Sequence, residues 1–181
     1  MALYTRKGDD GTTGLLFGGR VPKDAPSVEA NGAVDEAQAA IGAARAEVER
    51  GSEVDRLLVG AEHDLWVLMA ELATSPENRR KLEGGKTMVT PEMVSHLESV
   101  VDELEARFPM PTEFVIPGQD RLPALLDVAR TVVRRAERAA VPAAAPGSSV
   151  VPYLNRLSTL LWAMARWQEH GGSLTARSVG A

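Results

Sequence analysis

Apolar residues recur every three to four positions along five stretches of the chain, and this spacing predicts five amphipathic helices. The expected helices cover about residues 27–50, 53–73, 90–107, 120–141 and 151–170. In the second stretch the apolar residues follow the i, i+3, i+4 spacing of one helix face: Leu57, Leu58, Ala61, Leu65, Leu68, Met69 and Leu72. No alternating pattern of paired strands is found. The sequence therefore predicts an all-α, up-and-down five-helix bundle, formed by one domain over residues 1–181.

Three segments outside these helices have no helical period. Residues 1–26 are rich in Gly, Asp, Thr and Pro, so we expect a loop that a ligand could use. Residues 74–89 combine Pro, a basic run and Gly-Gly, which is typical of an exposed connection. The stretch FVIPG, residues 114–118, is short and apolar and is expected to be an extended segment leading into the fourth helix.

The composition excludes several classes of protein. A formal net charge of -5 argues against a general nucleic-acid binder. There is no cysteine, which rules out a disulfide framework and a thiol nucleophile, and the three histidines lack the spacing of metal ligands. No apolar run reaches the roughly 18 residues of a membrane span, and the N-terminus lacks the apolar run of a signal peptide. We therefore expect a cytoplasmic protein that binds neither nucleic acid nor membrane.

The expected fourth helix places a charged stripe opposite its apolar face. Arg130, Arg134, Glu137 and Arg138 stand at i, i+4, i+7 and i+8, so they share one face about two turns long. The planar guanidinium group matches phosphate oxygens, and three of them could clamp a triphosphate while Glu137 orients a guanidinium or holds a divalent cation. The alternative is a solvated helix face with weak ion pairs.

The N-terminal loop TRKGDDGTTG also suits a phosphate. Its glycines allow close backbone approach, and Arg6, Lys7 and Lys23 supply positive charge. The loop does not have the spacing of a P-loop, and a flexible terminus without a ligand is the alternative.

The expected fifth helix begins with YLNRLST, which places Asn155 and Thr159 on one polar face. Asparagine both donates and accepts hydrogen bonds, so Asn155 could recognise a ribose or an adenine edge. An inert exposed side chain is the alternative, and only the combination of the three segments is informative.

In this order the segments TRKGDDGTT, ARTVVRRAER and YLNRLST resemble the motifs of the ATP-dependent cobalamin adenosyltransferases, the PduO-type corrinoid adenosyltransferase family. VDEAQ at 34–38 and FVIPG add to the resemblance, which spans nearly the whole chain. The chain departs from the pattern at Thr159, where the family usually has Asp, at Gln38, where Asn is usual at or near this position, and at Gln119-Asp120 in the turn after FVIPG. The resemblance implies a homotrimer of five-helix bundles, with ATP between neighbouring subunits and cobalamin in an adjacent hydrophobic pocket.

The resemblance also assigns roles to particular residues. Arg130, Arg134, Glu137 and Asp35 would be catalytic, with Arg130 paired to Asp35 to brace the subunit interface and the active site. Phe114 would lie against the corrin face and help to displace the lower axial ligand of cobalt, and Glu137 would lie near Mg2+. ATP contacts would come from Thr5, Arg6, Lys7, Gly8, Thr13, Lys23, Arg134, Arg135, Glu137, Arg138 and Asn155.

The implied reaction transfers the 5′-deoxyadenosyl group of ATP to cob(I)alamin and releases triphosphate. Because Co(I) is itself a powerful nucleophile, the protein needs positioning, charge stabilisation and water exclusion rather than a nucleophilic side chain. Two alternatives remain: a non-catalytic relative that binds ATP or cobalamin to sense or deliver the cofactor, and a structural bundle that uses its arginines for subunit contacts. A cobalamin-dependent mutase is a candidate client of the product.

Overall fold

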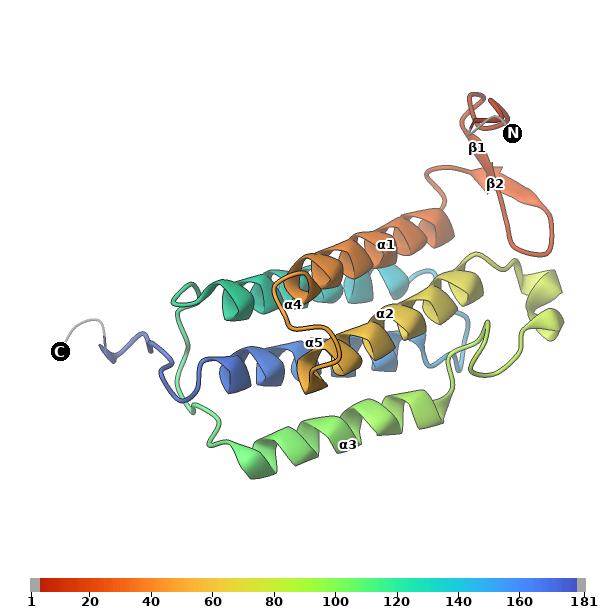
Figure 1. Cartoon of the computed structure of the whole chain (residues 1–181). Coiled ribbons are helices and arrows are strands. Elements are labelled where there is room, and N and C mark those ends of the chain that lie inside the picture. The colour runs from red at the N-terminus through yellow and green to blue at the C-terminus, as the bar shows by residue number, and fades with distance from the viewer. Residues whose placement is uncertain (1–3, 179–181) are drawn as a thin grey trace.

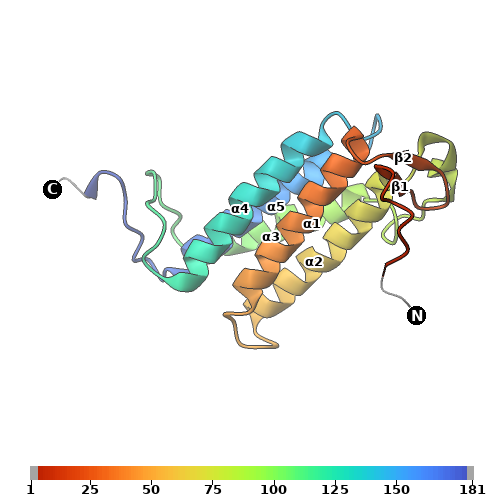
Figure 2. The same ribbon diagram turned by 90° about the horizontal axis from the view of Figure 1, so that it is seen from above.

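The computed structural model describes residues 4–178 and consists mainly of a helical bundle (Figure 1). Five α-helices form it: α1 (Pro26–Arg45), α2 (Glu53–Leu72), α3 (Pro91–Arg107), α4 (Arg121–Ala140) and α5 (Val150–Gln168). Successive helices run in opposite directions (Figures 1 and 2), so the predicted up-and-down five-helix bundle is confirmed. Within residues 4–178 no helix is both long and apolar enough to cross a membrane.

Two of the five helices, α2 and α3, are capped by a side chain at the N-terminus. Ser52 and Thr90 each accept a hydrogen bond from the backbone N–H three residues later, and Pro91 occupies the first position of α3. The first helix was predicted to reach residue 50, and this boundary is wrong, because α1 ends at Arg45. After Arg45 the chain makes tight turns up to Gly51, whose φ of 78° is a left-handed conformation that glycine adopts without strain.

Small residues set how the helices pack. α1 packs against α2 and α4, and α5 packs against α3 and α4. The α1–α4 contact is lined largely by alanine, which lets the two backbones approach closely: Ala30, Val34, Ala37, Ile41 and Ala44 meet Ala129, Val133, Ala136 and Ala140. Leucines of α5 fill the centre, and Figure 2 shows α5 between α4 and α3. This core fixes which face of α4 remains free.

A two-stranded antiparallel hairpin precedes the bundle, with β1 (Thr12–Gly14) paired to β2 (Arg20–Pro22). The prediction of no strands is wrong at this point, because strands of three residues are too short to show an alternating pattern. The hairpin lies at the end of the bundle where α1 begins (Figure 1). It is attached there by the Leu16 backbone N–H, which donates to the Ala73 carbonyl at 2.8 Å.

The connection 74–89 is partly ordered onto the bundle. It contains a short 3-10 helix, η1 (Pro76–Lys81), and its ends are buried at Thr74, Ser75 and Val89. The buried carboxylate of Glu71 holds both ends, because it accepts hydrogen bonds from Arg79 Nη2 at 2.8 Å and from the Val89 backbone N–H at 2.8 Å. Only the middle of this segment is exposed as the sequence predicted.

Candidate active site

The charged stripe of α4 lies on the solvent side of the helix, as its sequence spacing predicted. Arg134 and Arg138 are exposed, whereas Ala129, Val133 and Ala136 on the opposite face are buried. Arg138 Nη1 donates to the Arg134 carbonyl oxygen at 2.9 Å, which directs its guanidinium back along the helix. No described residue forms a hydrogen bond or ion pair with the Arg134 guanidinium, so it is free to meet a ligand.

Glu137 and Asn155 are brought together from two helices. Asn155 Nδ2 donates to Glu137 Oε1 at 3.0 Å, and Asn155 Oδ1 accepts from Arg156 Nη1 at 2.6 Å. Arg156 is in turn held by Glu98 of α3 at 2.7 Å. These bonds orient the Asn155 amide, because its oxygen faces a cation and its nitrogen faces a carboxylate. Arg156 lies within the YLNRLST motif but was given no role from the sequence, and Glu98 lies outside the motifs.

Glu137 is the carboxylate within the charged stripe of α4 that could meet a metal ion bound to phosphate. Over residues 4–178, no three His, Cys, Asp or Glu side chains come together as metal ligands. Magnesium on a nucleotide usually takes most of its ligands from phosphate and water, with one or two carboxylates from protein. A single carboxylate beside a cationic stripe therefore fits a nucleotide-borne cation and does not fit a cage built by protein alone.

The N-terminal loop is shaped by Asp10 and Arg20, which the sequence analysis did not single out. Asp10 accepts hydrogen bonds from the backbone N–H and hydroxyl of Thr12, and these bonds lower the pKa of the Asp10 carboxyl. Arg20 Nη2 crosses the hairpin to donate to the Lys7 carbonyl and the Thr12 hydroxyl. The two residues fold the loop so that its cationic side chains face outward.

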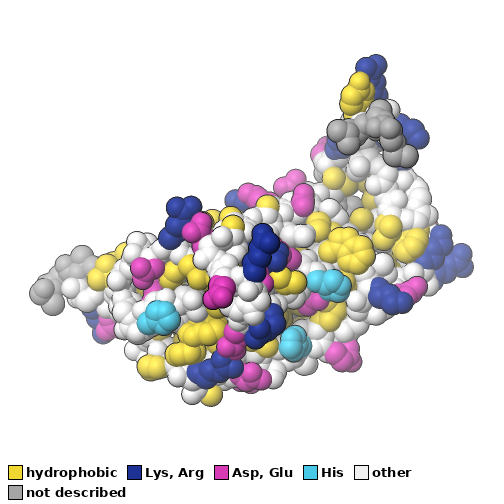
Figure 3. All heavy atoms as spheres, in the orientation of Figure 1, with side chains coloured by type: hydrophobic (Ala, Val, Ile, Leu, Met, Phe, Trp, Pro, Cys, Tyr) yellow, Lys and Arg dark blue, Asp and Glu magenta, His cyan; other side chains and the backbone are white. Residues whose placement is uncertain are grey.

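The sequence-predicted residues of this loop lie together. A Cβ atom on Gly8 would be 3.2 Å from Lys23 Nζ and 3.2 Å from the Thr12 carbonyl oxygen, so only glycine fits under the lysine without a shift. Thr13 pairs with Val21 in the hairpin. The side chains of Thr5, Arg6, Lys7 and Lys23 are exposed. On the face shown in Figure 3, Lys and Arg side chains lie at the hairpin end of the molecule, and others are spread over the helices.

The loop and the stripe form two separate groups within one chain. Among the described residues, no hydrogen bond or ion pair joins residues 4–23 to α4. The hairpin instead bonds to Ala73 at the end of α2 and to η1, where Asn78 Nδ2 donates to the Phe17 carbonyl at 3.4 Å. One chain therefore displays two separate parts of the site that the sequence predicted.

The predicted pair between Arg130 and Asp35 does not form within the chain. Arg130 Nε donates to Asp127 Oδ1 at 2.9 Å, one turn earlier on α4, while Asp35 is exposed on α1. The register of the helices explains this, because Arg135 of α4 pairs with Glu36 of α1. Arg130 is five residues before Arg135, which places it about 7.5 Å along α4 from the position opposite Glu36, at 1.5 Å per residue. Arg130 and Asp35 are therefore not partners within this chain.

Phe114 lies on the loop between α3 and α4 with 81% of its side chain exposed, which is unusual for a large aromatic residue. The neighbouring Val115 is buried and anchors the loop. A hollow of about 320 Å³ lies beside it, lined by residues of the loop and of α4: Pro117, Gly118, Ala124, Asp127, Val128, Arg130 and Thr131. The hollow thus extends from the Phe114 loop, at the end of the bundle where α4 begins, to Arg130 in the middle of α4, and an apolar ligand could meet the charged stripe there.

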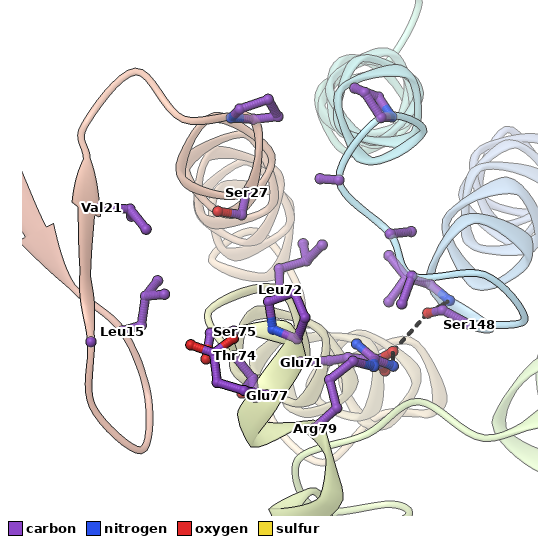
Figure 4. Close-up of a pocket in the computed structure, with 18 of the residues that line it drawn as sticks. Leu15, Val21, Ser27, Glu71, Leu72, Thr74, Ser75, Glu77, Arg79 and Ser148 are labelled. Carbon is purple, nitrogen blue, oxygen red and sulfur yellow. Dashed lines mark hydrogen bonds and ion pairs between the residues drawn. The ribbon is translucent and has the colours of Figure 1, made fainter.

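A cavity of about 710 Å³ lies at the opposite end of the bundle between the hairpin and the connection of α4 to α5 (Figure 4). Leu15 and Val21 of the hairpin face Ser27 and Leu72 of the helices across it. Ser148 donates to Glu71 at 2.7 Å in its wall. None of the residues predicted to contact ATP lines this cavity.

The fold and the site define a class: an all-α bundle that presents an arginine stripe, a glycine-rich cationic loop and an exposed aromatic loop. Residues 3–168 match the family model described as cobalamin adenosyltransferase. The chain belongs to the cobalamin adenosyltransferase family.

Similar proteins agree with this assignment. The chain is 42% identical to a corrinoid adenosyltransferase of Mycobacterium tuberculosis, over 98% of this chain and 94% of the relative. It is 38% identical to a corrinoid adenosyltransferase of Bacillus subtilis, over 92% and 86% of the two chains. A variant of the PduO-type ATP:corrinoid adenosyltransferase from Lactobacillus reuteri, complexed with cobalamin and ATP, has a similar fold with a TM-score of 0.85 at 27% identity, covering 97% of each chain.

Proposed function

We propose that this chain transfers the 5′-deoxyadenosyl group of ATP to the Co(I) centre of a corrinoid and releases triphosphate. The observation that carries the proposal is the free arginine stripe of α4 beside the oriented Glu137–Asn155 pair. The relatives that are similar in sequence to this chain over nearly their whole length are named corrinoid adenosyltransferases. Structural neighbours are complexed with cobalamin and ATP, which supports both substrates.

The transfer is a displacement at carbon. The electron pair of Co(I) attacks C5′ of ATP, a cobalt–carbon bond forms as the C5′–oxygen bond breaks, and the bonding pair leaves on the triphosphate. Cobalt is formally oxidised by two electrons, and no proton needs to move at the reacting carbon. The leaving triphosphate gains negative charge, which fixed guanidinium groups stabilise without reorganisation. Arg134 would supply such a group here, and Arg138, one turn further along α4, would mainly hold the terminal phosphates.

The remaining site residues position ATP. Thr5, Arg6, Lys7, Gly8, Thr13 and Lys23 of the loop, with Arg135 and Asn155, would contact the nucleotide. Glu137 would share a Mg2+ ion with the phosphates, because it is the carboxylate that the stripe offers. The ion would neutralise phosphate charge, and Asn155 would bond the ribose or the adenine.

A homotrimer would complete the site. The loop and the stripe do not meet within one chain, so an ATP bound between neighbouring subunits could use the loop of one and the stripe of the next. Arg130 pairs with Asp127 only through Nε, and no described residue accepts from its terminal nitrogens. These nitrogens could bond Asp35 of a second copy, which is exposed on α1.

At the other end of the bundle Phe114 would lie against the corrin face and help to displace the lower axial ligand. Its exposure and its position beside the hollow that Arg130 lines support this role. An adenosylated corrinoid made in the cytoplasm would serve an enzyme that uses it, and a corrinoid-dependent mutase remains the candidate client.

An anaerobic assay tests the proposal. Purified protein is mixed with MgATP and chemically reduced cob(I)alamin, and absorbance follows formation of the cobalt–carbon bond against a control without protein. Turnover that depends on both ATP and protein is the expected result. Binding of ATP and cobalamin by calorimetry without turnover would instead support a non-catalytic carrier or sensor.

A further inference from the structure

A buried ion network connects α4 to the end of α5. Asp127, Arg166 and Glu169 are 5%, 5% and 6% exposed. Arg166 Nη2 donates to Asp127 Oδ2 at 2.7 Å and to Glu169 Oε1 at 2.9 Å. Buried ion pairs are often no more stabilising than apolar residues of the same size, so stability alone is a weak reason to keep one. The segments that the network connects indicate its role better than its contribution to stability does.

One end of the network is Arg130. Asp127 uses its two carboxylate oxygens on two arginines: Oδ2 accepts from Arg166, and Oδ1 accepts from Arg130 Nε at 2.9 Å. Asp127 and Arg130 both line the hollow beside the Phe114 loop. The orientation of the Arg130 guanidinium therefore depends on a carboxylate that Arg166 fixes from the interior.

The other end of the network is the chain segment that follows α5. Ser173 donates its hydroxyl to Glu169 Oε2, and the Gly172 backbone N–H donates to the Glu169 carbonyl at 2.8 Å. These bonds turn the segment 173–178 back toward the loop between α3 and α4. Figures 1 and 2 both show the two segments at the end of the bundle where α4 begins.

Segment 173–178 holds the Phe114 loop by its backbone. The Ile116 N–H donates to the Leu174 carbonyl at 2.8 Å, and the Ala176 N–H donates to the Phe114 carbonyl at 2.9 Å. Val115 and Thr175 form an antiparallel bridge between these bonds. The backbone on both sides of Phe114 is thus fixed while its ring stays exposed.

We propose that Arg166 is a positioning residue that joins Arg130 to the Phe114 loop through Asp127, Glu169 and segment 173–178. The proposal rests on the proposed function, because it takes Phe114 as the residue that meets the corrinoid. A loop ordered by folding does not have to be ordered when the ligand binds, and this improves affinity for that ligand. Weakening the network should therefore weaken corrinoid binding and leave ATP binding intact.

Glu169→Ala tests this, because it removes the acceptor of both Arg166 and Ser173. We expect the KM and the Kd for the corrinoid to rise about tenfold, with the KM for ATP within about twofold of wild type. Glu169→Gln keeps the size and one acceptor oxygen, so the amide oxygen can accept from Arg166 while the amide NH2 donates to the Ser173 hydroxyl, and this variant should restore most of the corrinoid affinity. Asp55→Ala is the matched control: Asp55 is also buried and bonded to an arginine, Arg45 at 2.8 Å, at the same end of the bundle. It should lower Tm without changing either KM.

A double-mutant cycle separates positioning from general loosening. If Glu169 acts through the loop, Glu169→Ala in a Phe114→Ala background should change corrinoid affinity by less than about twofold. An equal loss in both backgrounds, or unchanged corrinoid affinity in folded Glu169→Ala, overturns the proposal. If Glu169→Ala does not fold, Ser173→Ala must show the same selective loss of corrinoid affinity, although a smaller one. Wild-type protein that neither binds corrinoid nor turns over would instead refute the function on which the proposal rests.

Discussion

Arg134→Ala gives the most direct test of the phosphate clamp. The guanidinium has no bond to any described residue, and the side chain is exposed, so its removal should change stability by less than about 0.5 kcal/mol. A charge-assisted hydrogen bond contributes about 1.5–3 kcal/mol, and a guanidinium can make two of them to a triphosphate. The loss would be about 3–6 kcal/mol of transition-state stabilisation, or about 10²- to 10⁴-fold in kcat/KM.

The anaerobic assay measures this loss, and a matched variant controls for the general effect of removing an arginine from α4. Arg121 stands on the same helix with a 79% exposed side chain, and it forms a surface ion pair with Glu47. Arg121→Ala should keep turnover within about twofold of wild type, because exposed ion pairs contribute little. Near wild-type turnover by Arg134→Ala, at unchanged Tm, would refute the clamp.

Two predictions concern stability. Tyr153→Phe should cost about 1.5 kcal/mol in denaturant unfolding, because the buried hydroxyl donates to Asp64 at 2.9 Å. Burial raises the pKa of Tyr153 in the folded protein. Above about pH 10 the tyrosine therefore ionises first in the unfolded chain, and the stability of the wild type should fall. Tyr153→Phe should lose less stability over this pH range, and equal alkaline profiles of the two proteins would contradict this. Gln38→Met should raise stability by about 1 kcal/mol, because Gln38 Oε1 is buried without a partner among the described residues. A fall in stability would show that this oxygen is bonded in the assembly.

The sequence predicted the helices well because each buries one regular face. The i, i+3, i+4 spacing locates α2 directly, and proline at Pro91 marks the start of α3. The hairpin could not be predicted the same way, since its strands are three residues long and are held by Arg20 and by the end of α2. Such contacts between distant segments leave no local pattern.

The site was predictable in part. The spacing of Arg130, Arg134 and Arg138 places them on one face, whereas the bond between Glu137 and Asn155 depends on the packing of α4 against α5. Arg166 could have been noticed as a charged residue on an apolar helix face, between Ala163 and Trp167, but its carboxylate partners are set by tertiary structure. The pair of Arg130 and Asp35 came only from the resemblance, and the register of α1 and α4 shows why one chain cannot form it.

The geometry of α4 also constrains how the substrates lie. Arg130 and Arg138 are eight residues apart, about 12 Å along the helix, which is comparable to an extended triphosphate with part of its nucleoside. Arg130 lies beside the hollow next to the Phe114 loop, whereas Glu137 and Arg138 lie toward the end of the bundle where α5 begins, and Glu137 is bonded there to Asn155. If Phe114 meets the corrinoid, the reacting carbon must lie nearer to Arg130 than the terminal phosphate does. Arg138→Ala should then raise the KM for ATP more than it lowers kcat, and Arg130→Ala should do the reverse, because Arg130 would be the nearer of the two to the bond that changes.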